Sequence, residues 1–123
     1  MDIKNTVQDL CKKYKTRDPY ELARSIGIIL QYGENMDTVR GFYLYANRIK
    51  LICLGNNLPE YIERFVLSHE LGHAVLHRRS SAPFLQSTFL SVDRLEIEAN
   101  KFAIELMMPD DVIAERQGYT IDQ

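Results

Sequence analysis

The sequence predicts an α+β domain in which helices precede and follow a small β-sheet. Apolar residues recur at helical spacing near the beginning and in the second half of the chain, and three short β-branched and aromatic runs lie between these regions. Helices and strands that are grouped in this way, rather than alternating, are typical of α+β architecture. A length of 123 residues suits one compact core, so we expect residues 1–123 to form a single domain.

The first two helices are predicted by apolar spacing and by residues that begin and end helices. Residues 2–15 place an apolar side chain every three or four positions. A second, shorter helix begins at Asp18, because Pro19 suits the first helical position, and it ends at Gly27.

The predicted sheet is small, antiparallel or mixed, and contains three strands. Residues 28–32, 42–45 and 49–54 are rich in β-branched and aromatic side chains. The last two strands flank Ala46-Asn47-Arg48, which predicts a hairpin, although this turn chemistry is weaker than that of Asn-Gly.

The second half of the chain predicts two longer helices with a loop between them. The first opens at Pro59 and reaches Arg78 and Arg79, with acidic residues in its first turns, as the helix dipole favours. Residues 80–91 are serine-rich but also apolar, which indicates a loop that packs over a cleft. The second long helix runs from about Asp93 to Met108, and a short helix follows over residues 110–118.

Composition and charge exclude several classes of protein. Hydrophobic residues make up 46% and charged residues 26% of the chain, which is ordinary for a folded domain. Fifteen Lys and Arg against seventeen Asp and Glu give a net charge of −2, so we expect no direct nucleic-acid binding. Because no apolar run could cross a membrane and the polar N-terminus does not resemble a signal peptide, we expect a cytoplasmic protein without membrane attachment. The oligomeric state stays open.

All three histidines lie on the helix that opens at Pro59, and two of them form an HExxH motif with Glu70. Residues four apart share one helix face, so His69 and His73 can reach a single metal ion. Catalytic zinc takes three protein ligands and leaves one position for water, whose proton Glu70 is placed to accept. The motif therefore predicts two zinc ligands and a general base, and a third ligand must come from elsewhere.

The last long helix offers two candidates for the third ligand. Glu98 lies on a face of alternating charges, which predicts a solvent-exposed position. Glu96 lies beside the apolar stripe, where an inward carboxylate needs a partner such as a metal ion, so we favour Glu96. We expect Asn100 to hydrogen-bond a ligand and small Ala99 to let another helix approach closely. A capping box with Asp93 as the N-cap is the open alternative for Glu96.

Other polar side chains could support the site without binding the metal. His77 extends the histidine row, but it is displaced by about 80° around the helix from His69, which favours contact with a ligand or simple packing over ligation. A tyrosine could stabilise the oxyanion of a hydrolytic reaction. The sequence does not choose among the candidates Tyr43, Tyr45 and Tyr119.

Two ordered segments resemble the ImmA/IrrE family of zinc-metallopeptidase-like proteins. The first combines residues 49–59 (IKLICLGNNLP) with residues 64–77, which contain HELGH, and the second covers residues 96–109 (EIEANKFAIELMMP). The resemblance extends from about Asp18 to Pro109, and two segments in the right order are far more specific than HExxH alone.

The resemblance implies a zincin-like fold in which the HExxH helix packs beneath the small sheet. It implies zinc ligands at His69, His73 and Glu96, with Glu70 as the general base. Members of the family often cleave a helix-turn-helix repressor that is encoded in a phage, a mobile element or a stress-response locus. Relatives often continue into further helices, so we expect a C-terminal extension to be absent or truncated in this chain.

The HExxH motif predicts a zinc-dependent peptidase, and the resemblance implies an endopeptidase that makes a limited cut in a helix-turn-helix transcriptional repressor and so derepresses phage, mobile-element or stress genes. Zn²⁺ is the expected cofactor, and the repressor is the expected partner. An alternative is a non-catalytic antirepressor that binds such a repressor, with a structural or vestigial zinc site. A third possibility is a small helical interaction module with a chance HExxH, which predicts no tight metal binding.

Overall fold

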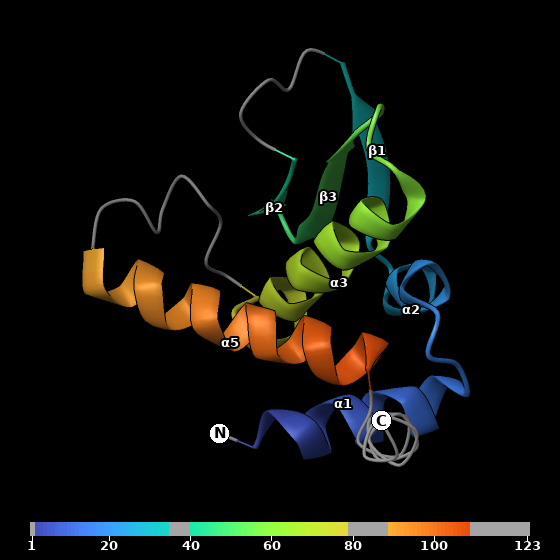
Figure 1. Cartoon of the computed structure of the whole chain (residues 1–123), viewed down its shortest axis with the longest axis vertical. Coiled ribbons are helices and arrows are strands. Elements are labelled where there is room, and N and C mark those ends of the chain that lie inside the picture. The colour runs from blue at the N-terminus through green and yellow to red at the C-terminus, as the bar shows by residue number, and fades with distance from the viewer. Residues whose placement is uncertain (1, 35–39, 79–88, 109–123) are drawn as a thin grey trace, which may run out of the picture.

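The order of helices and strands agrees with the prediction (Figure 1). The computed structural model describes residues 2–34, 40–78 and 89–108. Its helices are α1 (Ile3–Tyr14), α2 (Pro19–Ile26), α3 (Glu60–Leu76) and α5 (Phe89–Met107), and its strands are β1 (Ile29–Gly33), β2 (Gly41–Ala46) and β3 (Ile49–Gly55). The described residues therefore confirm the α+β class. The predictions for residues 35–37, 80–88 and 110–118 and for Arg79 fall outside them.

Helix α2 begins and ends at the predicted residues. The carboxylate of Asp18 accepts a hydrogen bond from the backbone N–H of Tyr20 at 3.0 Å, and Pro19 occupies the first turn. Gly27 ends the helix with φ at 92°, a left-handed conformation that glycine adopts without steric cost.

Two boundaries of the longer helices differ from the predictions. Helix α3 ends at Leu76, so Arg78 lies beyond the helix instead of in its last turn. Helix α5 begins at Phe89, because serine lowers helix propensity only slightly and does not prevent a helix there. Asp93 therefore lies inside α5 and cannot be its N-cap, so the capping-box alternative for Glu96 is wrong.

The sheet is mixed, with strand order β1-β3-β2. Strands β2 and β3 pair antiparallel with Tyr43 opposite Ile52, as the hairpin predicts, whereas β1 pairs parallel to β3 with Leu30 opposite Ile52. Strand β3 is thus central, and β2 is an edge strand.

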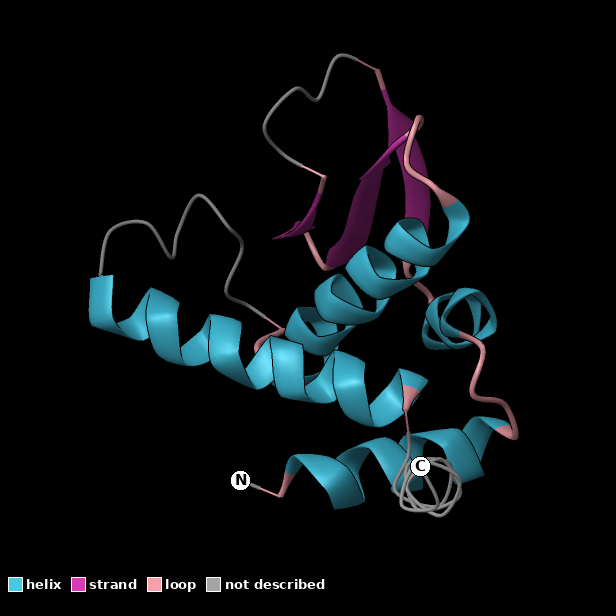
Figure 2. Ribbon diagram, in the orientation of Figure 1, coloured by secondary structure: helices cyan, strands magenta, loops and turns pink. Residues whose placement is uncertain are grey.

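The helices pack in successive layers on the sheet. Helix α3 lies between the sheet and α5, and α1 packs against α5 (Figure 2). Each fully buried aliphatic or aromatic side chain contributes about 1.5–3 kcal/mol to folding. The fully buried side chains include Val7, Leu22, Tyr43, Ile52, Leu54, Leu67, Leu71 and Phe102. Apart from Val7, they come from α3 itself and from elements that pack against it, so the core holds the HExxH helix in a fixed position.

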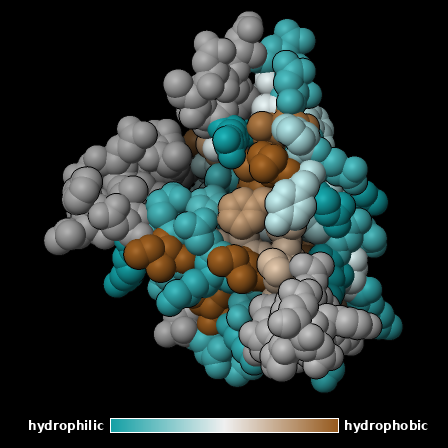
Figure 3. Space-filling view, in the orientation of Figure 1, coloured by the Kyte–Doolittle hydropathy of each residue, from teal (hydrophilic) through white to brown (hydrophobic). Residues whose placement is uncertain are grey.

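Helix α5 also has a surface that faces solvent. Its residues Ile97 and Ile104 are 55% and 47% exposed, and Figure 3 shows hydrophobic patches on a mainly hydrophilic face. Apolar residues exposed in this scattered way are common on folded proteins. Among the described residues, no helix has the length and apolar character needed to cross a membrane.

The hairpin turn contains a backbone strain that a substitution can relieve. Asn47 and Arg48 have φ values of 51° and 63°, as a two-residue type I′ turn requires. This conformation suits asparagine or glycine better than arginine. We expect Arg48→Gly to raise the free energy of unfolding by about 0.5–1 kcal/mol, measured by urea denaturation. Arg48→Ala keeps the strain, so an equal gain in that control would contradict this explanation.

Candidate metal centre

Helix α3 presents both HExxH histidines toward α5. The imidazole rings of His69 and His73 lie one turn apart, with ring centroids 4.9 Å from each other. Their side chains are only 14% and 5% exposed. Because the core fixes α3 on both sides, these rings have little freedom to move away from each other.

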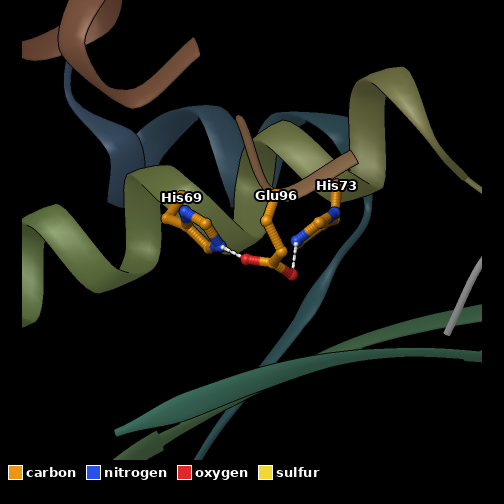
Figure 4. Close-up of side chains that lie close together, drawn as sticks. All are labelled: His69, His73 and Glu96. Atoms are coloured by element: carbon orange, nitrogen blue, oxygen red, sulfur yellow. Dashed lines mark hydrogen bonds and ion pairs between the residues drawn. The ribbon is translucent and has the colours of Figure 1, made fainter. Parts of the chain in front are cut away.

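The carboxylate of Glu96 on α5 lies between the rings of His69 and His73 (Figure 4). One carboxylate oxygen lies 2.8 Å from Nε2 of His69, and the other lies 2.9 Å from Nε2 of His73. The three potential ligand atoms lie within 4.8 Å of one another. Two imidazole nitrogens and one carboxylate oxygen form the kind of donor set that catalytic zinc uses. The structure thus brings together the three residues that the sequence suggested, and their donor atoms fit a zinc ion.

The structure corrects the predicted exposure of the two glutamates on α5. The side chain of Glu96 is 44% exposed, whereas that of Glu98 is only 19% exposed. The solvent-exposed position predicted for Glu98 is wrong, because its carboxylate accepts a hydrogen bond from Nε2 of His77 at 2.7 Å. A helical wheel gives the angle of a side chain but not the neighbour that covers it.

The other ring nitrogen of each paired histidine also has a partner. Nδ1 of His69 lies 2.7 Å from the side-chain oxygen of Asn100, which confirms the contact expected for Asn100. Nδ1 of His73 lies 3.2 Å from Nδ1 of His77. Both Nε2 atoms therefore remain directed at Glu96, and His77 contacts a histidine of the centre without joining the donor group.

Gly72 allows the close approach of α3 and α5 that this geometry needs. A β-carbon at this position would lie 3.0 Å from Cβ of Phe102 and 3.2 Å from both Cα and the carbonyl oxygen of Ala99. Ala99 is fully buried. The expectation that a small residue at position 99 permits close helix packing is therefore confirmed.

Glu70 lies in a buried environment beside the histidines. It is 8% exposed, and its carboxylate accepts a hydrogen bond from the backbone N–H of Tyr43 in β2. Burial raises the pKa of Glu70 to about 7, even though His69 and His73 oppose this rise. A carboxyl group with a pKa near neutrality suits both acceptance and return of a proton.

A cleft adjoins Glu70 at the edge of the sheet. Its volume is about 430 Å³. It is lined by Arg40, Gly41, Phe65, Val66, His69, Glu70 and Asn100. The cleft therefore meets the candidate centre, the HExxH helix and the beginning of the edge strand β2.

The ionisation of Glu96 depends on its hydrogen bonds with the two histidines. Hydrogen bonds from His69 and His73 hold the pKa of Glu96 well below its usual range. Burial alone would lower the pKa of His69, but its hydrogen bond to Glu96 and the nearby carboxylates outweigh burial and raise it. The carboxylate of Glu96 is therefore ionised at neutral pH, as a metal ligand must be.

Of the three tyrosines considered as oxyanion donors, Tyr43 is not available for that role. The hydroxyl of Tyr43 donates a hydrogen bond to the carbonyl oxygen of Arg78 at 2.6 Å. Tyr43 is only 1% exposed. Burial raises the pKa of Tyr43 to about 12. Tyr43 is thus a core residue, Tyr45 is half-buried on β2, and Tyr119 lies outside the described residues.

The amino-acid sequence of the chain is similar to those of known proteins over most of its length. The profile of the Peptidase M78 family, described as the IrrE N-terminal-like domain, matches residues 24–123. Metallopeptidase ImmA of Bacillus subtilis (strain 168) is 30% identical over 128 residues, which cover 98% of this chain and 74% of that protein. The chain belongs to the ImmA/IrrE family. Uncharacterized immunity region protein 2 of Bacillus phage phi105 is 46% identical over 123 residues, which cover 98% of this chain and 78% of the phage protein.

Membership of the ImmA/IrrE family agrees with the donor set described above. The family is one of metallopeptidases, which implies a metal ion, typically zinc. The cluster of His69, His73 and Glu96 is where the described residues could hold it. The pairing of His77 with Glu98 was missed from the sequence; His77 directly follows the end of α3, four residues beyond His73.

Proposed function

We propose that this ImmA/IrrE protein is a zinc-dependent endopeptidase that makes a limited cut in a helix-turn-helix transcriptional repressor. The observation that carries the proposal is the convergence of His69, His73 and Glu96 beside the buried carboxyl group of Glu70. The arrangement of α3 beneath the sheet is, in this proposal, that of a zincin. The cytoplasm, where such repressors act, is the proposed location.

The residues of the centre have separate roles in the proposed reaction. His69, His73 and Glu96 would hold the ion, which supplies polarisation of the scissile carbonyl group and increases the acidity of water. Glu70 would accept the proton of the attacking water molecule and return it to the leaving amine. Burial and the backbone N–H of Tyr43 hold this carboxyl group beside the donor atoms, which suits that role.

The position of the cleft supports a peptide as the substrate. Gly41 and Arg40 line it at the start of β2, and β2 is an edge strand. An extended peptide can pair with such an edge and gain backbone hydrogen bonds. The repressor itself is suggested by the phage relative, whose name places it in an immunity region.

The first test measures zinc per chain in the wild-type protein, Glu96→Gln and the control Glu105→Gln. We expect close to one zinc ion in the wild type and the control, and its loss from Glu96→Gln, because only Glu96 supplies an oxygen to the donor set. The zinc-loaded wild type is then incubated with each helix-turn-helix repressor of its genome and should cut one of them into two defined fragments. Absence of zinc from the wild type, or an intact repressor after prolonged incubation with the zinc-loaded protein, would contradict the proposed function.

A further inference from the structure

Glu98 and His77 form a chain of contacts that ends at one of the proposed zinc ligands. The carboxylate of Glu98 lies 2.7 Å from Nε2 of His77, and Nδ1 of His77 lies 3.2 Å from Nδ1 of His73. His73 then directs its remaining nitrogen, Nε2, to the donor cluster. The side chains of His77 and Glu98 are 4% and 19% exposed, so water competes little for these contacts.

We propose that Glu98 is a positioning residue that fixes, through His77, the proton on Nδ1 of His73 and so leaves Nε2 of His73 free to bind the metal ion. This inference rests on the proposed function, because it concerns how the proposed metal centre is prepared. It assigns a role to two residues outside the donor group.

The position of the proton on each of the two histidines follows from the atom that its ring contacts next. A metal ion on Nε2 of His73 requires the lone pair of that nitrogen, so the proton of the neutral ring must be on Nδ1. Nδ1 of His73 then needs an acceptor, which is Nδ1 of His77, so the proton of His77 must be on its Nε2. That N–H needs an acceptor in turn, and the carboxylate of Glu98 can only accept.

Helix α5 thus provides a partner for Nδ1 of His69 and, through His77, for Nδ1 of His73. Asn100 meets Nδ1 of His69 directly, and Glu98 meets Nδ1 of His73 through His77. Glu96, Glu98 and Asn100 all belong to α5. Partners of this kind set the ring orientation and proton position of metal-binding histidines, and their loss typically weakens metal affinity about 10–100-fold.

The test compares the zinc dissociation constants of the wild type and Glu98→Gln by competition with a chromophoric chelator. Glutamine removes the charged acceptor: its amide can donate to Nε2 of His77, which places two N–H groups against each other on the Nδ1 side, and its neutral oxygen holds the proton on Nε2 less strongly than a carboxylate does. We expect zinc binding to weaken about 10–100-fold. Glu105→Gln, the same change about two turns further along α5, should bind zinc as tightly as the wild type.

A spectroscopic measurement on the wild type reads the proton positions directly. The chain has three histidines, so the ring nitrogens of ¹⁵N-histidine-labelled, zinc-loaded protein can be assigned by NMR. We expect the proton of His77 on Nε2 and that of His73 on Nδ1. A proton on Nδ1 of His77 would overturn the inference.

The outcomes separate this inference from the proposed function. A role limited to packing would lower the melting temperature of Glu98→Gln but leave the zinc dissociation constant of the folded protein unchanged. Equal zinc binding by the wild type and Glu98→Gln, within about twofold, would therefore overturn the role of Glu98 and leave the proposed function intact. A wild type that binds no zinc would overturn both.

Discussion

Replacement of Glu70 by glutamine is expected to lower the rate of repressor cleavage by about 10²–10⁴-fold while zinc stays bound. Glutamine keeps the shape of the side chain but cannot accept the proton of the attacking water. The measurement is a cleavage time course with zinc-loaded protein, and Glu105→Gln is the matched control. If Glu70→Gln still inactivates the repressor without cutting it, the protein acts as an antirepressor and the proposed enzyme mechanism is wrong.

The same variant should show a pH-dependent gain in stability when the protein is free of metal. Burial raises the pKa of Glu70 from its ordinary value near 4.5 to about 7. A carboxyl group with a raised pKa contributes its stabilisation fully below pH 4.5 and loses it as the pH rises through 7. Glutamine carries no charge and does not suffer this loss.

Urea denaturation of chelator-treated protein checks the sign of this effect. At pH 8 we expect Glu70→Gln to exceed the wild type in free energy of unfolding by up to about 3 kcal/mol, and near pH 4 we expect little difference. A gain of equal size at both pH values would mean that the ionisation of Glu70 is not its source.

Replacement of Gly72 by alanine is the second change expected to have a large effect. The added β-carbon would meet the backbone of Ala99 at 3.2 Å and Cβ of Phe102 at 3.0 Å, so α5 must move away by a few tenths of an ångström. Overpacking of this kind costs about 1–3 kcal/mol, and the better helix propensity of alanine offsets up to about 1 kcal/mol. Metal sites tolerate deviations of only about 0.2 Å, so we expect zinc affinity to fall more than about tenfold.

Gly55→Ala provides the control for this prediction. A β-carbon at Gly55 would find its nearest neighbour, the carbonyl oxygen of Arg40, at 3.5 Å, an ordinary contact distance. Zinc affinity should therefore stay at the wild-type value in Gly55→Ala. If Gly72→Ala also keeps wild-type zinc affinity, the close approach of α3 and α5 does not set the geometry of the donor atoms.

Much of the architecture could be predicted because local sequence signals agree with the packing. The caps of α2, the β-branched strands and the HExxH spacing each act over a few residues. The angular separation of about 200° between Glu96 and Glu98 on a helix placed Glu96 near the histidines, although the exposures that the sequence predicted for the two side chains were wrong. The parallel pairing of β1 with β3 had no comparable signal, because strand order depends on contacts between distant segments.

The contact between Glu98 and His77 could not be predicted for a similar reason. Alternating charges along one helix face usually indicate exposure to solvent. In this chain His77, the residue after α3, lies against that face and donates a hydrogen bond to Glu98. Only the position of one helix on the other reveals this contact, and the periodicity of either helix alone contains no information about it.

The proposed donor atoms and the proposed general base depend on different parts of the fold. His69, His73 and Glu96 come from α3 and α5 alone, whereas the carboxylate of Glu70 also depends on the backbone N–H of Tyr43 in the edge strand. Changes in the hairpin can therefore alter proton transfer without rebuilding the helix pair. If the proposed function holds, such a division would let substrate preference and reaction rate change through the strands while the helices keep the metal site.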